Sequence, residues 1–168
     1  MKKMILALVF AMMTAGMASA QNYMVVDSEK IFKSISSYNS ALDSIEKLAE
    51  QYQQQVDAKF AEVEKLYNSY MQQRASFSEA YRQQYEQMIL QKEQEAAEYQ
   101  ESLFSTEGEL MKKRMELIQP IQQRVFNAIE RIATQYGYDL VIDISANPTI
   151  LYYSSKVDFT QKIINALR

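Results

Sequence analysis

The sequence predicts a mainly helical protein with a small β part, in which a long antiparallel helical hairpin projects from a small body. The composition favours helices, because the 168 residues include only three Gly and two Pro and the rest are rich in good helix formers. Apolar residues recur at steps of three and four over most of the chain, which is typical of helices with one buried stripe. Near both ends, short runs rich in β-branched and aromatic residues predict strands instead.

The residue types that are missing exclude most enzyme chemistry. The chain has no His, no Cys and no Trp, so it has no thiolate nucleophile, no imidazole base and no zinc site built from nitrogen or sulfur ligands. Charge between the apolar positions of a predicted helix serves solubility rather than acid–base catalysis, and this applies to Glu93, Glu95, Glu98 and Glu101. Asp27 and Asp143 flank predicted strands and are expected to be helix-cap or turn residues. We expect no enzyme, no metal and no cofactor.

Residues 1–20 are predicted to be a cleaved signal peptide. They begin with two lysines, continue with an apolar run up to Met17 and end in Ala18-Ser19-Ala20, which has the small-x-small pattern of a cleavage site. The apolar run is shorter than the roughly 20 residues that span a bilayer, which argues against an uncleaved anchor. Cleavage after Ala20 removes both lysines and no acid, so the net charge falls from −3 to −5. Export and this acidic charge disfavour a nucleic-acid partner.

Two helices are predicted to pair through apolar stripes in antiparallel register. The outbound stripe comprises Leu42, Ile45, Ala49, Tyr52, Val56, Val63, Tyr67 and Tyr70. The return stripe, with Lys92 and Thr106 at intervening positions, comprises Tyr81, Tyr85, Met88, Ala96, Tyr99, Leu103, Leu110, Leu117, Ile121, Val125 and Ile132. The numbers of facing residues sum to 151 or 152 from Tyr70–Tyr81 to Leu42–Leu110. This register predicts a hairpin over residues 39–114 with its tip near 72–79, where Ser76 and Glu79 have capping-box spacing.

The return helix continues beyond its partner. Beyond Arg114 it has no outbound residue left to face except in the region 32–38, so something else is expected to cover its remaining apolar residues, which are Leu117, Ile118, Ile121, Val125, Ile129 and Ile132. Pro120 lies inside this stretch and removes one helical hydrogen bond, which predicts a kink. We interpret Pro120 as a hinge candidate, with a static kink as the alternative. Gly137 is expected to end the helix.

The two ends of the chain, residues 21–38 and 115–168, are predicted to form a β-containing body. Its elements are strands at 23–26, 139–144 and 149–153, a turn at Asn147-Pro148 between the last two, and a final helix over 159–168 with Asp158 as N-cap. Elements this short bury too little surface to be stable alone. We therefore expect several copies of the chain to build one shared body.

Three segments near the ends carry a family resemblance. They are Val25-Val26-Asp27 with Ile31-Phe32, Tyr138-Asp139-Leu140-Val141-Ile142-Asp143, and Tyr152-Tyr153-Ser154-Ser155 with Asp158-Phe159-Thr160. These segments, and the order of elements over the whole mature chain, resemble the Skp/OmpH family of periplasmic chaperones. The resemblance implies a homotrimer with a small β-barrel body and three helical tentacles around a cavity that holds unfolded outer-membrane proteins. It implies no nucleotide and no metal.

Seven apolar residues lie at or beyond the edges of the two-helix seam, where one hairpin cannot bury all of them. They are Met71, Phe77, Ile89, Leu90, Phe104, Met111 and Met115. Met and aromatic side chains suit adaptable contacts of low specificity. We expect the set to line part of the client cavity; the alternative is that its members widen the seam or pack against a neighbouring arm.

Positive charge is concentrated on the return helix after the acidic shafts. Lys112, Lys113 and Arg114, followed by Arg124 and Arg131, form the one concentrated basic patch of the sequence. The resemblance implies a patch for anions or lipopolysaccharide at the first three of these residues. The alternative is a set of Lys and Arg side chains solvated on a helix face, and the acidic shafts depart from the typically basic family.

These observations predict an ATP-independent holdase chaperone of the periplasm. Its expected partners are unfolded outer-membrane proteins, further copies of itself in a homotrimer, and a membrane or lipopolysaccharide surface. The alternative is a structural coiled-coil protein of the cell envelope. The strand-rich ends favour the chaperone, because a coiled-coil spacer has no need of them.

Overall fold

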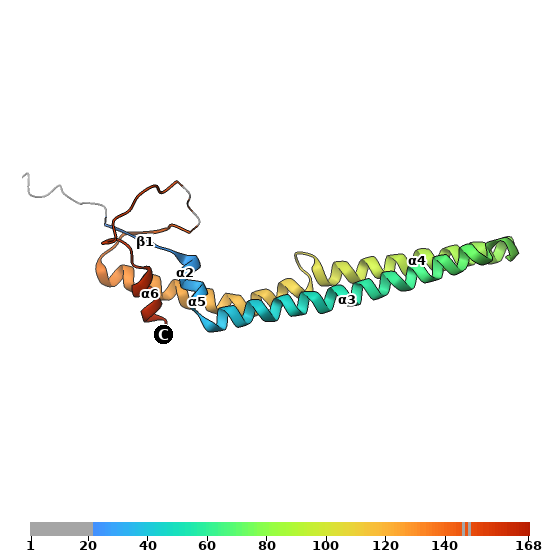
Figure 1. The fold of residues 1–168 in the computed structure, drawn as a ribbon, viewed down its shortest axis with the longest axis horizontal. Coiled ribbons are helices and arrows are strands. Elements are labelled where there is room, and N and C mark those ends of the chain that lie inside the picture. The colour runs from blue at the N-terminus through green and yellow to red at the C-terminus, as the bar shows by residue number, and fades with distance from the viewer. Residues whose placement is uncertain (1–21, 146, 148) are drawn as a thin grey trace, which may run out of the picture. The chain divides into compact units, whose positions relative to one another are not determined.

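The structure, a computed structural model, describes residues 22–145, 147 and 149–168, so the predicted signal peptide lies outside the described residues. Along the chain, the elements are β1 (Tyr23–Val26), α2 (Ser28–Lys33), α3 (Ser36–Gln73), the 3-10 turn η1 (Arg74–Ser76), α4 (Glu79–Phe104), α5 (Glu109–Tyr136), β2 (Leu140–Asp143) and α6 (Thr160–Ala166) (Figure 1). The prediction of a mainly helical chain with a small β part is confirmed.

The chain divides into two compact units, which are described separately. The hairpin unit comprises residues 36–122. The sheet unit comprises the described residues up to Ile35 together with 123–168. The second division therefore falls inside α5, between Gln122 and Gln123.

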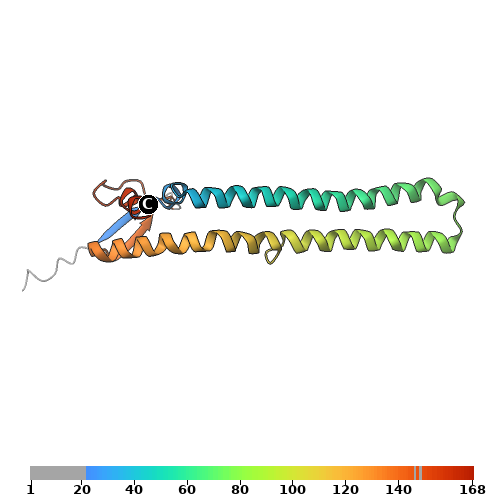
Figure 2. The ribbon, with the colours of Figure 1, turned by 90° about the horizontal axis from the view of Figure 1, so that it is seen from below.

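In the hairpin unit, α3 and α4 run antiparallel side by side (Figures 1 and 2). The buried positions of each helix repeat at steps of seven: Val56, Val63 and Tyr70 on α3, and Ile89, Ala96 and Leu103 on α4. This repeat keeps one stripe of each helix facing the other. Between the tip and Leu103 the predicted stripe was wrong at one layer, because Ile89 rather than Met88 packs with Val63. Tyr67 and Tyr81 lie at the edge of the stripe and stay about half exposed.

The tip is held by an aromatic cluster. The Phe77 ring lies 4.6 Å from that of Tyr81 and 5.7 Å from that of Tyr85, which stacks on Tyr70 at 5.5 Å. Ser78, and not the predicted Ser76, is the N-cap of α4: its hydroxyl accepts a hydrogen bond from the Tyr81 N–H. Ser76 lies in the 3-10 turn η1 instead, so α4 begins two residues later than the capping-box spacing predicted.

The return helix is interrupted, which corrects the prediction that Thr106 occupies a seam position. Between α4 and α5, residues 105–108 leave the helical line as a small loop that projects to one side (Figure 2). Gly108 is buried against the end of α4. A Cβ atom at this position would lie 2.7 Å from the carbonyl oxygen of Leu103, so the loop closes only with glycine there.

The loop changes the register of everything after it. Residues 105–108 do not extend the helical line. Each residue of α5 therefore faces a residue of α3 that comes later in the sequence than the one it would face if the return helix were uninterrupted. Ile118 is buried with Ala41 and Ile45, and Leu117, Ile121, Tyr38, Leu42 and Leu110 pack around them. The expectation that something other than the outbound helix covers the end of the return helix is therefore wrong for Leu117, Ile118 and Ile121, which α3 itself covers. Further along α5, Val125 and Ile132 are buried in the sheet unit.

In the sheet unit, β1 is the central strand. It pairs in parallel with β2, from Tyr23 opposite Leu140 to Val26 opposite Asp143. On its other edge, the Val25 N–H donates to the Val157 carbonyl at 2.8 Å, and the Phe159 N–H donates to the Val25 carbonyl at 3.0 Å. Met24, Val25 and Val26 of β1 are buried. The other side chains of this core include Ile31, Val125, Ile132 and Ile163.

The predicted strand at 149–153 is not formed. On the edge of β1 opposite β2, the residues that pair are 157–159. Residues 149–153 form no strand. Leu151 and Tyr152 remain 95% and 86% exposed, because no other segment of the described chain covers them. Of the predicted Asn147-Pro148 turn, Pro148 lies outside the described residues, while the Asn147 carbonyl accepts a hydrogen bond from the Ile150 N–H.

Helix ends in the sheet unit follow the sequence closely. Gly137 adopts a positive φ of 71° and the Tyr138 N–H donates back to the Ala133 carbonyl, as in a Schellman motif; the predicted helix end is confirmed. Asp27 is the N-cap of α2, as expected. The predicted N-cap of the final helix is wrong, because α6 begins at Thr160 and its N-cap is Phe159 rather than Asp158. The Asp158 carboxylate instead accepts a hydrogen bond from the Thr160 N–H, two residues on, at 2.9 Å.

Asp143 joins the end of β2 to the start of α2. Its carboxylate accepts hydrogen bonds from the backbone N–H and the hydroxyl of Ser28 and from the same two groups of Ser145. Partial burial acts to raise the pKa of Asp143, but these hydrogen bonds outweigh it, those from the hydroxyls most, and hold the pKa below its ordinary value. Asp143 is therefore a turn residue, as predicted.

The Asp143→Ala substitution should lower the free energy of unfolding at pH 7 by about 1–3 kcal/mol, because charge-assisted hydrogen bonds to two serines are lost. A carboxyl whose pKa is lowered by folding stabilises the fold above its unfolded pKa, and this contribution is lost as the pH falls through the folded value. Urea unfolding should therefore show a difference in the free energy of unfolding at pH 7 that shrinks as the pH falls below the ordinary aspartate pKa of about 3.9. Asp139→Ala, at an exposed carboxylate, is the control; an equal effect of both substitutions contradicts the assignment.

The Gly108→Ala substitution should destabilise the chain by about 1–3 kcal/mol, since the added methyl group meets backbone atoms of Leu103 and Ser105 at under 3 Å. Urea unfolding of this variant measures the loss. Thr106→Ala, in the same loop but exposed, should leave stability unchanged. A Gly108→Ala variant as stable as the parent chain means that the loop has another conformation open to it.

Candidate functional site

Four of the seven predicted edge residues are exposed on the hairpin. Leu90 is 67% exposed, Met115 55% and Met71 49%, and Met111 is also exposed. Large apolar side chains at this exposure are surplus to the fold of a single chain. These four residues are the candidates for contact with another molecule.

The other three predicted residues belong to the hairpin's own packing. Ile89 is buried in the seam. Phe104 is half buried, with its ring edge-on to Tyr52 at 6.4 Å, and Phe77 is part of the tip cluster. For these residues the alternative interpretation holds: they widen the seam.

A groove lies on one edge of the hairpin near the tip. Its volume is about 240 Å³, and its lining residues are Tyr67, Tyr70, Met71, Arg74, Glu86, Ile89 and Leu90. The sequence analysis identified Met71 and Leu90 but missed Tyr67 and Arg74. Tyr67 was assigned to the seam; its position four residues after Val63, outside the strict steps of seven, was the signal that it lies at the edge.

The polar groups of the groove are centred on Tyr70. The Tyr70 hydroxyl donates a hydrogen bond to the Glu86 carboxylate, and this bond is the main cause of the raised pKa of Tyr70. The guanidinium of Arg74 lies 6.0 Å from the centre of the Tyr70 ring, within the range of cation–π contacts. The Tyr70 ring is thereby fixed from two sides.

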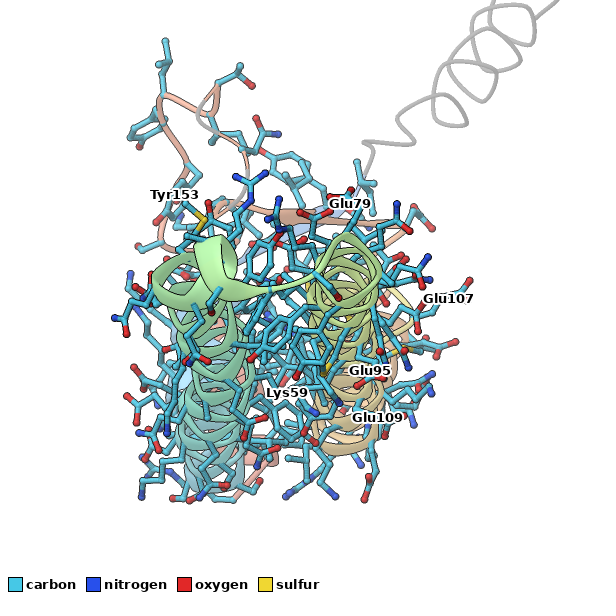
Figure 3. The ribbon with its side chains drawn as sticks, turned by 90° about the vertical axis from the view of Figure 1, so that its right-hand side faces the viewer. Lys59, Glu79, Glu95, Glu107, Glu109 and Tyr153 are labelled. Carbon is cyan, nitrogen blue, oxygen red and sulfur yellow. The ribbon has the colours of Figure 1, made fainter. Side chains whose placement is uncertain are left out.

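The opposite edge of the hairpin is closed by polar contacts. The Tyr99 hydroxyl donates to the Gln55 side chain, and the Lys59 ammonium lies 4.7 Å from the Tyr99 ring centre. Lys92 pairs with Glu95 at 2.5 Å, which lowers the pKa of Glu95. In the end-on view of Figure 3, Lys59 lies between the two helices whereas Glu107 points away from α3.

The predicted basic patch is largely neutralised by its own helix. Lys112 pairs with Glu109 at 2.8 Å and Lys113 with Glu116 at 2.9 Å. The hydrogen bond to Glu109 raises the pKa of Lys112. Of Lys112, Lys113 and Arg114, Arg114 has no carboxylate of the described residues within ion-pair distance, so it is the one of these three that is open to an anion.

Pro120 lies inside α5, and the helix continues through it to Tyr136. The side chain is exposed. The division between the two units follows two residues later. The role of Pro120 as a hinge stays a prediction.

The part of the chain that the structure describes contains neither a helix suited to cross a membrane nor a cluster of metal ligands. None of the helices there is long and apolar enough to cross a membrane. Nor does that part of the chain contain a group of three or more His, Cys, Asp or Glu side chains placed to hold a metal ion.

Comparison with protein families decides the assignment. The family described as "Outer membrane protein (OmpH-like)" matches residues 22–167, which is nearly all of the chain that the structure describes. The chain belongs to the OmpH-like family. Comparison with curated proteins gives no match.

Membership of the OmpH-like family confirms the resemblance that the end segments indicated. The family is one of periplasmic chaperones, not of enzymes, and its chaperones bind outer-membrane proteins. In this member, the exposed apolar residues of the hairpin and the groove near its tip are candidate surfaces for contact with another protein.

Proposed function

We propose that this OmpH-like protein is an ATP-independent holdase that keeps unfolded outer-membrane proteins soluble in a cavity between helical arms. The observation that carries the proposal is the exposure of Leu90, Met115, Met71 and Met111 on a hairpin that has no core to bury them. In a chaperone family, surplus Met and Leu side chains are suited to clients of varied sequence, because they adapt to different partners.

The mechanism is encapsulation by many weak contacts. Each exposed side chain contributes little by itself, but contacts on several arms add through a high effective concentration. Release needs no nucleotide, because folding and insertion of the client remove the unfolded state to which the arms bind.

The proposal includes a homotrimer, which is supported by what a single chain leaves uncovered in the sheet unit. In the described residues, β2 has β1 on one edge and no strand on the other. Leu140, Phe126, Leu151 and Tyr152 are exposed around this small sheet. Two further copies would cover these side chains and complete a β-barrel body.

The proposal includes the cell compartment and the anion patch. Cleavage after Ala20 releases the chain into the periplasm. Arg114, with Lys112 and Lys113 held by their glutamates, gives a weak site for a lipopolysaccharide or membrane phosphate. Weak binding there is consistent with the acidic shafts.

Light scattering on the mature chain tests the proposal. Over a dilution series the mass should correspond to a trimer, and a urea-unfolded outer-membrane barrel protein diluted into it should stay soluble in a one-to-one complex with that trimer. A trimer that leaves the client to aggregate favours a structural envelope protein, and a monomer or dimer contradicts the shared body.

Matched variants make the test specific for the exposed residues. The triple variant Met71→Ser, Leu90→Ser and Met115→Ser should hold the client about tenfold more weakly, if each side chain loses part of the roughly 1.5–3 kcal/mol of full burial. The control carries Gln72→Ser, Gln91→Ser and Gln119→Ser, at exposed polar neighbours. Equal holding by both variants contradicts the role of the apolar residues.

The Pro120→Ala substitution should narrow the spread of the arms and the range of client sizes held, because it restores the helical hydrogen bond that proline removes. Since the chain has no Cys, a Ser76→Cys variant carries one spin label per tip, and distances between tips report the spread. Gln119→Ala is the control. An unchanged distance distribution and client range means that Pro120 is a static feature.

A further inference from the structure

We propose that the groove near the tip binds one apolar side chain of an unfolded client and that Arg74 selects a client residue with an acidic neighbour. The inference rests on the proposed holdase function and names the site and the client chemistry. It depends on three features of the groove: its shape, its charge and its position on one edge only.

The shape suits a single side chain. The groove holds about 240 Å³, below the roughly 300–1,000 Å³ of sites for drug-sized ligands. Tyr70 and Ile89 form a buried floor, and the exposed side chains of Tyr67, Met71 and Leu90 form the rim. A fixed floor and an adjustable rim of Met and Leu accept aromatic or aliphatic side chains of different shapes.

Glu86 is the carboxylate that lines the groove, and its cation is Arg74. Its counterpart Glu86 already accepts the Tyr70 hydroxyl, and the neighbouring cation of the tip, Arg82, is held by Glu79 and by the Phe77 carbonyl. Among the described residues, no carboxylate lies within ion-pair distance of Arg74. Its guanidinium therefore has donors to spare for a carboxylate on the client.

The groove lies on one edge of the hairpin, and the other edge is chemically different. Met88 is 40% exposed, but it does not line the groove. Two residues along a helix correspond to about 200° of rotation, so Leu90 and Met88 point away from each other. On the Met88 side, Lys92 and Glu95 satisfy each other. The hairpin thus presents its groove edge, and not its polar edge, to the client.

Thiol labelling of two single-cysteine variants tests this orientation, since the parent chain has no Cys. In the full chain, saturating urea-unfolded barrel protein should slow labelling of the Leu90→Cys variant about fivefold, as expected when client is present at roughly four times its dissociation constant. Labelling of the Met88→Cys control should change little. Equal protection of both positions, or of neither, overturns the groove as the binding site.

Tryptophan peptides test the chemistry, because the protein has no Trp of its own and only the peptide emits on excitation of indole. Acetyl-Gly-Asp-Trp-Ser-Gly-amide should bind about threefold more tightly than the same peptide with Lys for Asp, as expected for an exposed charge pair. Arg74→Gln should abolish this preference, and Leu90→Ser should weaken both peptides. No preference in the parent chain overturns the role of Arg74.

The two failures are distinguishable. If the barrel protein aggregates in the presence of the parent chain, the holdase function itself is wrong. If it stays soluble while the Leu90→Cys variant labels at its free rate, the function stands and the groove is overturned. Slow labelling of the Leu90→Cys variant without client means that a neighbouring arm fills the groove, which also overturns the proposal.

Discussion

Two helices that pack only on each other can each bury a single stripe of side chains, and this constraint determines the character of the protein. On α3 and α4 the stripe repeats at steps of seven from Val56 to Tyr70 and from Ile89 to Leu103, and the large apolar residues Tyr67, Met71 and Leu90 beside it remain exposed. A third helix would give such residues a core. In this hairpin, Leu90 and Met71 have no such cover within the chain, so the architecture that makes the arm thin also supplies its binding surface.

The loop at residues 105–108 reconciles this hairpin with the rest of the return helix. Without it, Leu117, Ile118 and Ile121 would lie beyond the first residue of α3 and would have no part of that helix to face. Because residues 105–108 leave the helical line, Leu117, Ile118 and Ile121 pack instead with Ala41 and Ile45. The close turn of this loop is possible because residue 108 is a glycine. A small insertion thus changes the register without breaking the apolar stripe on either side of it.

The sequence predicted what depends on local periodicity and missed what depends on pairing between distant segments. The hairpin and the helix end at Gly137 were confirmed because steps of three and four, and a glycine with a positive φ, are local signals. Three consecutive apolar residues, Met88, Ile89 and Leu90, fit the stripe equally well, so the pattern alone did not identify the buried one. The run at 149–153 has strand-forming residues, but strand pairing is decided by partners, and β1 pairs with 157–159 instead. For the groove, Met71 and Leu90 were predictable as surplus residues, whereas the role of Arg74 required knowledge of which cations already had partners.

The central position of β1 has a consequence for the order in which the chain folds. The first strand bonds to residues more than a hundred positions later, on both of its edges, so the sheet unit cannot close until synthesis reaches the last helix. Contacts within the hairpin span far shorter stretches and form without waiting. A nascent chain therefore displays its arm before it has a closed sheet, and the last residues to emerge are those that complete the second edge of the first strand.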